Sequence, residues 1–156
     1  MVTVEVTFTP LPAHVRTARL VATAVARRSG VDESLLDEVR LAVGEACSRA
    51  VEAHQRHCPG LPIRLALTDD GERFEVVVTD AVPADMALDP AGGNGTAPGA
   101  AAGDGAGGAA DGGVLLQLPA GVGLAVISGL ADDFRISPDG DGTSVAMSWK
   151  RRAEPA

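Results

Sequence analysis

Aromatic residues and cysteines are scarce in this chain of 156 residues, and no long hydrophobic run is present. Three phenylalanines, one tryptophan and no tyrosine mean that the core must be mostly aliphatic. No apolar stretch is long enough to cross a bilayer, and no signal peptide precedes Val2. Because the net charge is −8, direct binding to nucleic acid is disfavoured. We therefore expect a cytoplasmic protein that binds neither membrane nor nucleic acid.

The two cysteines, Cys47 and Cys58, fall in or just after one expected helix, where a disulfide between them would have poor geometry. With His54 they could form a zinc face, but the short Cys-x-x-Cys or His-x-x-x-His spacing is missing. Reduced cysteines, with a buried thiol and surface histidines, and no metal site are the simpler interpretation. Four arginines could form a solvated helix face or a docking patch for an acidic partner: Arg16, Arg19, Arg27 and Arg28.

Hydrophobic periodicity predicts the order β-α-α-β-β-loop-α-β-β. The predicted strands are residues 2–8, 63–67, 74–80, 134–137 and 144–149, and the predicted helices are 13–28, 32–55 and 121–131. This order favours the α+β class, with helices on one face of a mixed, mostly antiparallel sheet. Residues 91–113, rich in glycine and alanine, cannot bury enough apolar surface to become ordered. We expect one domain (1–150) with a disordered insert there and a mobile tail (151–156).

Four segments carry motifs in a characteristic order. They are the helix segment 41–54, the strand segment 75–80, Gly121-Val-Gly-Leu124 before a helix, and Gly142-Thr143 before the last strand. Together they resemble the GHKL ATPases, and among these the anti-sigma-factor serine kinases of the RsbW and SpoIIAB type. The resemblance implies a Bergerat-type two-layer sandwich. It also implies a nucleotide pocket formed by Glu45, Arg49, Asp80, Gly121, Gly123, Leu124 and Thr143.

The resemblance gives these positions roles that this chain only partly supports. In the family, the glutamate at Glu45 is a general base, an asparagine four residues later holds magnesium, and the aspartate at Asp80 reads adenine. Here Arg49 replaces the asparagine, and a guanidinium cannot ligate a metal ion. Arg49 could instead pair with Glu45 one helical turn away, or hold a phosphate directly. The family's Asp-x-Gly-x-Gly reads Asp80-Ala-Val-Pro-Ala84, and residues 84–114 contain no lysine or arginine.

These departures predict a degenerate member with no catalytic residue and with neither ATP nor magnesium as cofactor. The resemblance then implies a regulator in a partner-switching system. It would bind a STAS-type anti-anti-sigma antagonist, a sigma factor or both, as a homodimer or a heterodimer. The alternative is an active serine kinase that phosphorylates the antagonist, with Glu45 as base and magnesium ATP as phosphate donor. A third interpretation places a ligand other than ATP in the pocket.

Overall fold

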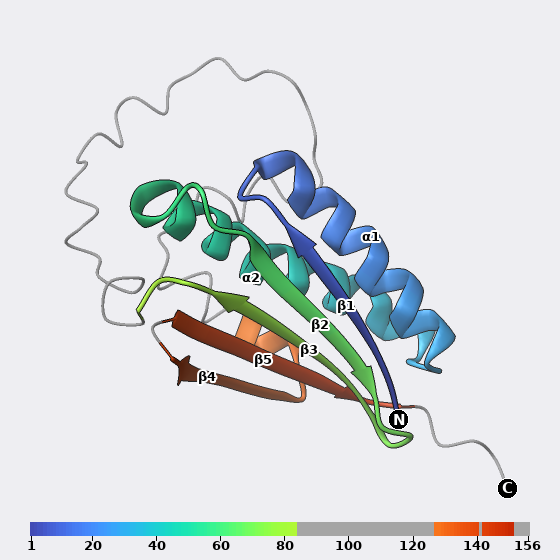
Figure 1. The fold of residues 1–156 in the computed structure, drawn as a ribbon. Coiled ribbons are helices and arrows are strands. Elements are labelled where there is room, and N and C mark those ends of the chain that lie inside the picture. Colours follow the sequence, from blue (N-terminus) through green and yellow to red (C-terminus); the bar gives the residue numbers. More distant parts are fainter. Residues whose placement is uncertain (84–126, 141, 152–156) are drawn as a thin grey trace, which may run out of the picture.

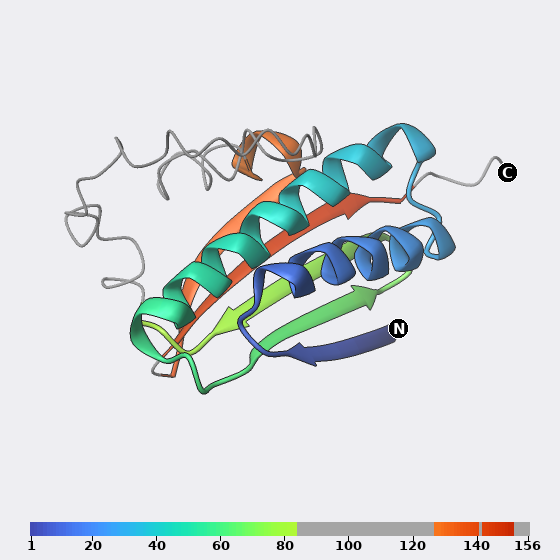
Figure 2. The same ribbon diagram turned by 90° about the horizontal axis from the view of Figure 1, so that it is seen from above.

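The computed structural model describes residues 1–83, 127–140 and 142–151. These residues form a two-layer sandwich in which two long helices cover one face of a five-stranded sheet (Figures 1 and 2). The strand order is β1-β2-β3-β5-β4, so that β3 is central, and every described pair is antiparallel. The predicted α+β fold is confirmed. The expected disordered insert (91–113) and tail residues 152–156 lie outside the described residues.

The two long helices begin and end close to where the sequence predicts. Helix α1 (Pro12–Arg28) has proline in its first turn and ends before Gly30, whose φ of +86° suits a residue without a side chain. Helix α2 (Leu36–His57) follows a short 3-10 helix, η1 (Glu33–Leu35), capped by the Asp32 carboxylate at 2.9 Å from the Ser34 amide. None of the described helices is both long and apolar enough to span a membrane.

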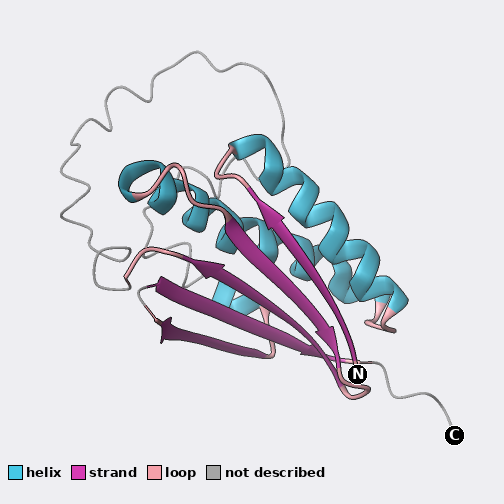
Figure 3. Cartoon of the chain, viewed as in Figure 1, coloured by secondary structure: helices cyan, strands magenta, loops and turns pink. Residues whose placement is uncertain are grey.

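Successive side chains of β1, β2 and β3 alternate between a more buried and a less buried face. The two long helices lie on one side of the sheet (Figure 3). They are β1 (Val2–Phe8), β2 (Ile63–Asp69), β3 (Arg73–Asp80), β4 (Asp133–Asp139) and β5 (Gly142–Lys150). The core is mostly aliphatic, as predicted, with the rings of Phe74 and Trp149 stacked at 6.3 Å between centroids. The Trp149 indole donates to the Leu130 carbonyl at 2.9 Å and so anchors residues 127–130, the described part of the third helix.

Helix α2 lies over the centre of the sheet, beside α1 (Figure 2). Both helices carry buried alanines: Ala18, Ala22 and Ala26 on α1, and Ala42, Ala46 and Ala50 on α2. Gly44 lets α1 approach α2 closely, because a Cβ there would lie 2.7 Å from Cδ of Arg19. The packing holds one face of α2 against the end of β3, where the candidate site lies.

Candidate functional site

A buried ion pair joins Arg49 of α2 to Asp80 at the end of β3. The Arg49 Nη2 atom donates to Asp80 Oδ2 at 2.5 Å, and the two side chains are 4% and 0% exposed. Within the described part of the chain, Arg49 Nε and Nη1 have no hydrogen-bond partner. Pairing of Arg49 with Glu45, one of the two alternatives that the sequence left open, does not form. The long guanidinium side chain reaches across to the strand instead, where a fully buried carboxylate offers a stronger partner.

Asp80 has both carboxylate oxygens engaged. Oδ2 accepts from Arg49, and Oδ1 accepts from the amide of Val82 at 2.8 Å. In the family that this chain resembles, the aspartate must accept from an adenine amino group. Here an arginine of the same chain occupies the carboxylate.

The chain just after Asp80 is held from two further elements. The Thr143 hydroxyl of β5 donates to the Val82 carbonyl at 2.7 Å. His54 of α2 accepts from the Ala81 amide through Nε2 at 2.9 Å. Since a backbone amide can only donate, Nε2 carries no proton, and Nδ1 donates to the Leu61 carbonyl at 2.9 Å. Residues 80–82 are therefore tied to α2, to β5 and to each other.

Sequence reasoning missed this role of His54. The prediction of a surface histidine is wrong, because the side chain is fully buried. The signal was its spacing, seven residues after Cys47 and four after Ala50, which continues the buried stripe of α2. Cys47 is buried and Cys58 partly exposed, and both are free. In the described ranges no cluster of three His, Cys, Asp or Glu side chains could hold a metal ion.

Gly142, predicted from its motif with Thr143, sits where β5 comes close to β3. A Cβ on this residue would lie 1.9 Å from the Asp80 carbonyl oxygen, so any side chain would clash with backbone. The absence of a side chain brings Thr143 within reach of Val82. Gly121, Gly123 and Leu124, the other predicted pocket residues, lie outside the described residues.

Glu45 is the predicted general base and lies one helical turn before Arg49. It is 8% exposed, and no residue in the described ranges donates a hydrogen bond to it. Burial raises the pKa of its carboxyl, and the nearby charge of Glu52 adds to the effect. A raised pKa suits an acid or base that exchanges protons near neutral pH. The direction of this shift is the one that a general base in the kinase alternative requires.

The described residues do not fit magnesium ATP. The position that should offer a metal ligand carries a cation, and that cation is already paired with the carboxylate that should read adenine. The same pairing weakens the idea that Arg49 holds a phosphate, because Asp80 neutralises its charge. We derive no chemical step through a nucleotide.

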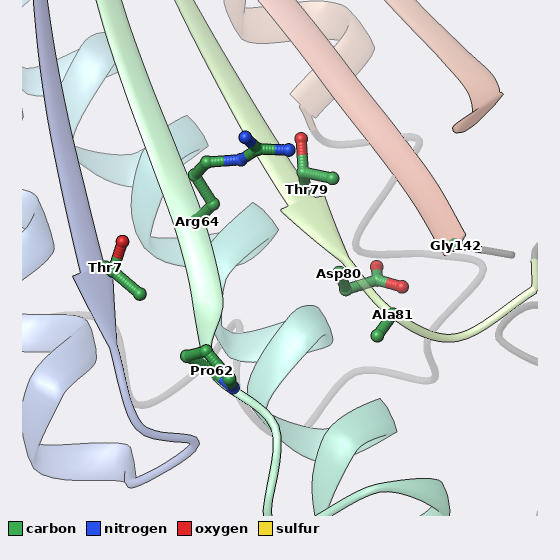
Figure 4. A pocket seen from close by; sticks show the side chains of 7 residues that line it. All are labelled: Thr7, Pro62, Arg64, Thr79, Asp80, Ala81 and Gly142. Carbon is green, nitrogen blue, oxygen red and sulfur yellow. The ribbon is translucent and has the colours of Figure 1, made fainter. Parts of the chain in front are cut away.

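A pocket of about 390 Å³ opens next to this site, on the side of the sheet away from the helices (Figure 4). Thr7, Arg64 and Thr79 line it from three adjacent strands, and Pro62, Asp80, Ala81 and Gly142 complete its rim. Sequence reasoning gave no sign of it, because strand register alone brings these residues together.

Comparisons with known proteins agree with this geometry. The model of the histidine kinase-like ATPase domain family matches residues 8–149, and the chain belongs to this family. The fold is also similar to the crystal structure of the RsbU and RsbW domains of Rv1364c from Mycobacterium tuberculosis, with a TM-score of 0.60 and 19% sequence identity. That alignment covers 100% of this chain but 34% of the solved chain. A search of curated proteins found no match.

Proposed function

We propose that this chain is a regulatory binding domain of the RsbW type that works without ATP-dependent phosphorylation. Its partner would be a STAS-type anti-anti-sigma antagonist, a sigma factor, or both. The observation that carries the proposal is the buried ion pair between Arg49 and Asp80. The family membership and the RsbW-containing structural neighbour support the choice of partner class.

The ion pair disfavours nucleotide binding for an energetic reason. Asp80 already accepts hydrogen bonds from Arg49 and from the Val82 amide. If adenine displaces Arg49 from it, breaking the buried pair costs about 3–5 kcal/mol. That penalty corresponds to about two to four orders of magnitude in affinity. A fold can retain its partner surfaces when a small-molecule site decays, because the two functions use different residues.

Without a working phosphate donor, the antagonist would not be released by phosphorylation of its own serine. Binding would then be constitutive, and the domain would act as a sink that titrates the antagonist. The second candidate function is the active serine kinase, which the raised pKa of the Glu45 carboxyl favours.

Calorimetry with ATP, with and without magnesium, separates the two functions. We expect no heat from the wild-type chain at ATP concentrations up to the millimolar range. Arg49→Asn should bind magnesium ATP at least tenfold more tightly than wild type, because the change frees Asp80 and restores a metal ligand. The matched control is Arg56→Asn on the exposed face of the same helix.

Magnesium-dependent binding by the wild type at micromolar ATP, weakened by Arg49→Asn, would instead establish the kinase alternative. Partner binding is tested separately by titrating STAS-domain proteins, unphosphorylated and with aspartate at the phosphorylatable serine. We expect wild type and Arg49→Asn to bind the unphosphorylated form equally. Failure of every STAS protein and sigma factor to bind would refute the proposed partner class.

A further inference from the structure

The pocket beside the candidate site lies where two strands stop pairing with each other. The β2–β3 ladder ends at the pair Arg64–Thr79, although β3 runs one residue further. Pro62, which precedes β2, cannot extend the ladder, because proline has no amide hydrogen. On the other strand, the Ala81 amide donates to His54 of α2 instead. The two strands therefore part at this end of the sheet, and the pocket of about 390 Å³ opens there.

One row of polar side chains crosses this pocket. Thr7, Arg64 and Thr79 are partners in register on three adjacent strands. The Arg64 side chain extends from β2 toward Thr79, and Thr7 lies on the other side of it, on β1 (Figure 4). The Thr79 hydroxyl is 3.1 Å from the Ser144 hydroxyl of β5. When Ser144 donates in this hydrogen bond, Thr79 keeps its own hydrogen for a ligand. The row thus offers a guanidinium flanked by two hydroxyl groups.

The charge of Arg64 is not neutralised within the described part of the chain. Its side chain is exposed, and it forms neither an ion pair nor a side-chain hydrogen bond with a described residue. Asp80 also lines the pocket, but its carboxylate oxygens already accept from Arg49 and from the Val82 amide. The pocket therefore presents an unpaired cation on a chain whose net charge is −8. A ligand that fits it carries negative charge.

We propose that this pocket binds a small organic anion with a carboxylate or phosphate head group. The Arg64 guanidinium would bind the head group through two parallel hydrogen bonds, which both kinds of anion accept. The Thr79 hydroxyl, toward which Arg64 points, would donate a third (Figure 4). The volume of the pocket lies within the usual range for small-molecule sites, about 300–1,000 Å³.

The spacing of the strands indicates that the ligand is larger than a bare ion. Thr7 and Thr79 lie on either side of β2, so their backbones are about 10 Å apart, twice the usual distance between neighbouring strands. A phosphate ion bound to Arg64 and Thr79 cannot also reach Thr7. A hydroxyl or carbonyl group on the body of an organic anion can do so. Pro62 and the Ala81 methyl group line the pocket and offer apolar contact to the same body.

Titrations of the full chain followed by NMR test the site with defined probes. Glycerol 3-phosphate and glycerate carry the same two hydroxyl groups on different head groups, and glycerol is the uncharged control. We expect millimolar binding of at least one of the two anions, none of glycerol, and several-fold weaker binding of inorganic phosphate. Sodium chloride at matched ionic strength controls for screening. The amide signals that move should be those of residues around the pocket: Thr7, Arg64, Thr79 and Ala81.

Two pairs of variants separate the pocket from the rest of the same sheet face. Arg64→Gln should weaken binding at least tenfold, because it removes the charge-assisted hydrogen bonds. Arg135→Gln, which removes an exposed cation of β4 on the same face, should leave binding unchanged. Thr79→Val should weaken binding several-fold. Its control is Thr3→Val, because the Thr3 hydroxyl also has a hydroxyl partner, Thr68 at 3.3 Å, but lies outside the pocket.

Tighter binding of one organic anion identifies the head group, and either result supports the proposal. It fails if neither anion moves the amide signals of the pocket, or if Arg64→Gln binds them as tightly as the wild type does. Inorganic phosphate that binds as tightly as glycerol 3-phosphate would overturn the organic part of the ligand. Circular dichroism confirms that each variant is folded. These titrations need neither nucleotide nor partner protein, so their outcome is independent of the proposed function.

Discussion

Arg49 is the residue at which this chain departs most from the motif that it resembles. The departure matters because Arg49 pairs with Asp80, a second residue of the predicted site. A cation in the metal-ligand position could have pointed to solvent, to Glu45 or to a phosphate. It lies instead against Asp80, with 4% of its side chain exposed. Under the proposed function, this one residue accounts for the loss of two positions of the family's nucleotide site, the metal ligand and the adenine reader.

The strength of this pair can be measured by a double-mutant cycle. Arg49→Met and Asp80→Asn should each lower the free energy of unfolding by about 3–5 kcal/mol, because each leaves the other group buried without its partner. The double variant should lose clearly less than the sum of the two, since it leaves no uncompensated charge. Urea denaturation measures all four proteins. Additive losses would show that the pair contributes little and that the pocket is free to open.

Among the elements, α2 and β5 both hold the backbone that follows β3 by hydrogen bonds. His54 holds the Ala81 amide from the helix, and Thr143 holds the Val82 carbonyl from the neighbouring strand. In the family this stretch carries glycines that let the backbone pass beneath adenine. In this chain the contacts fix Val82 in the core, fully buried.

Gly142→Ala tests how closely β5 must approach β3. The added methyl group would lie 1.9 Å from the Asp80 carbonyl oxygen, so one strand has to shift. We expect a loss of about 1–3 kcal/mol or more in the free energy of unfolding. Gly60→Ala is the matched control, because no atom lies within 4 Å of its Cβ position, and its effect should stay within about 0.5 kcal/mol. Equal effects of the two changes would contradict the close approach.

On the scale of the whole molecule, the two long helices bury one face of the sheet, and no described helix covers the other. The core between the layers includes Cys47, which has no exposed surface. Burial raises the pKa of its thiol to about 12. Cys58 lies just beyond the end of α2 and is partly exposed. Partial burial raises the pKa of its thiol, and the negative charge of Asp80 adds a smaller effect in the same direction.

Thiol labelling should therefore report the opening of the whole domain. At pH 8 a disulfide reagent should modify Cys58 in the folded protein, while Cys47 should react only when the core unfolds. In Cys58→Ser, the labelling rate of Cys47 should rise with urea in parallel with global unfolding. Rapid labelling of Cys47 in native buffer would show that α1 and α2 separate locally, without unfolding of the sheet.

The sequence by itself determined the fold, because the fold depends on patterns that repeat along the chain. Alternation at Val2–Phe8, helical spacing from Leu36 to His57, and the turn before Arg73 are local signals that tertiary packing reinforced. It also predicted Glu45, Arg49, Asp80 and Thr143 as residues of one site, and the structure brings Arg49 into contact with Asp80 and Thr143 into contact with Val82. That prediction depended on a family resemblance as well as on the spacing of the residues.

Only the tertiary structure decided how those residues pair. Arg49 is four positions from Glu45 but 31 from Asp80, and local spacing favours the nearer partner. Both carboxylates are buried, but Asp80 is the more deeply buried, at 3% exposure against 8% for Glu45, and a buried charge needs a partner. Tertiary packing also made His54 a link between the Ala81 amide and the Leu61 carbonyl. Contacts of this kind depend on strand register and helix packing, which no short stretch of sequence encodes.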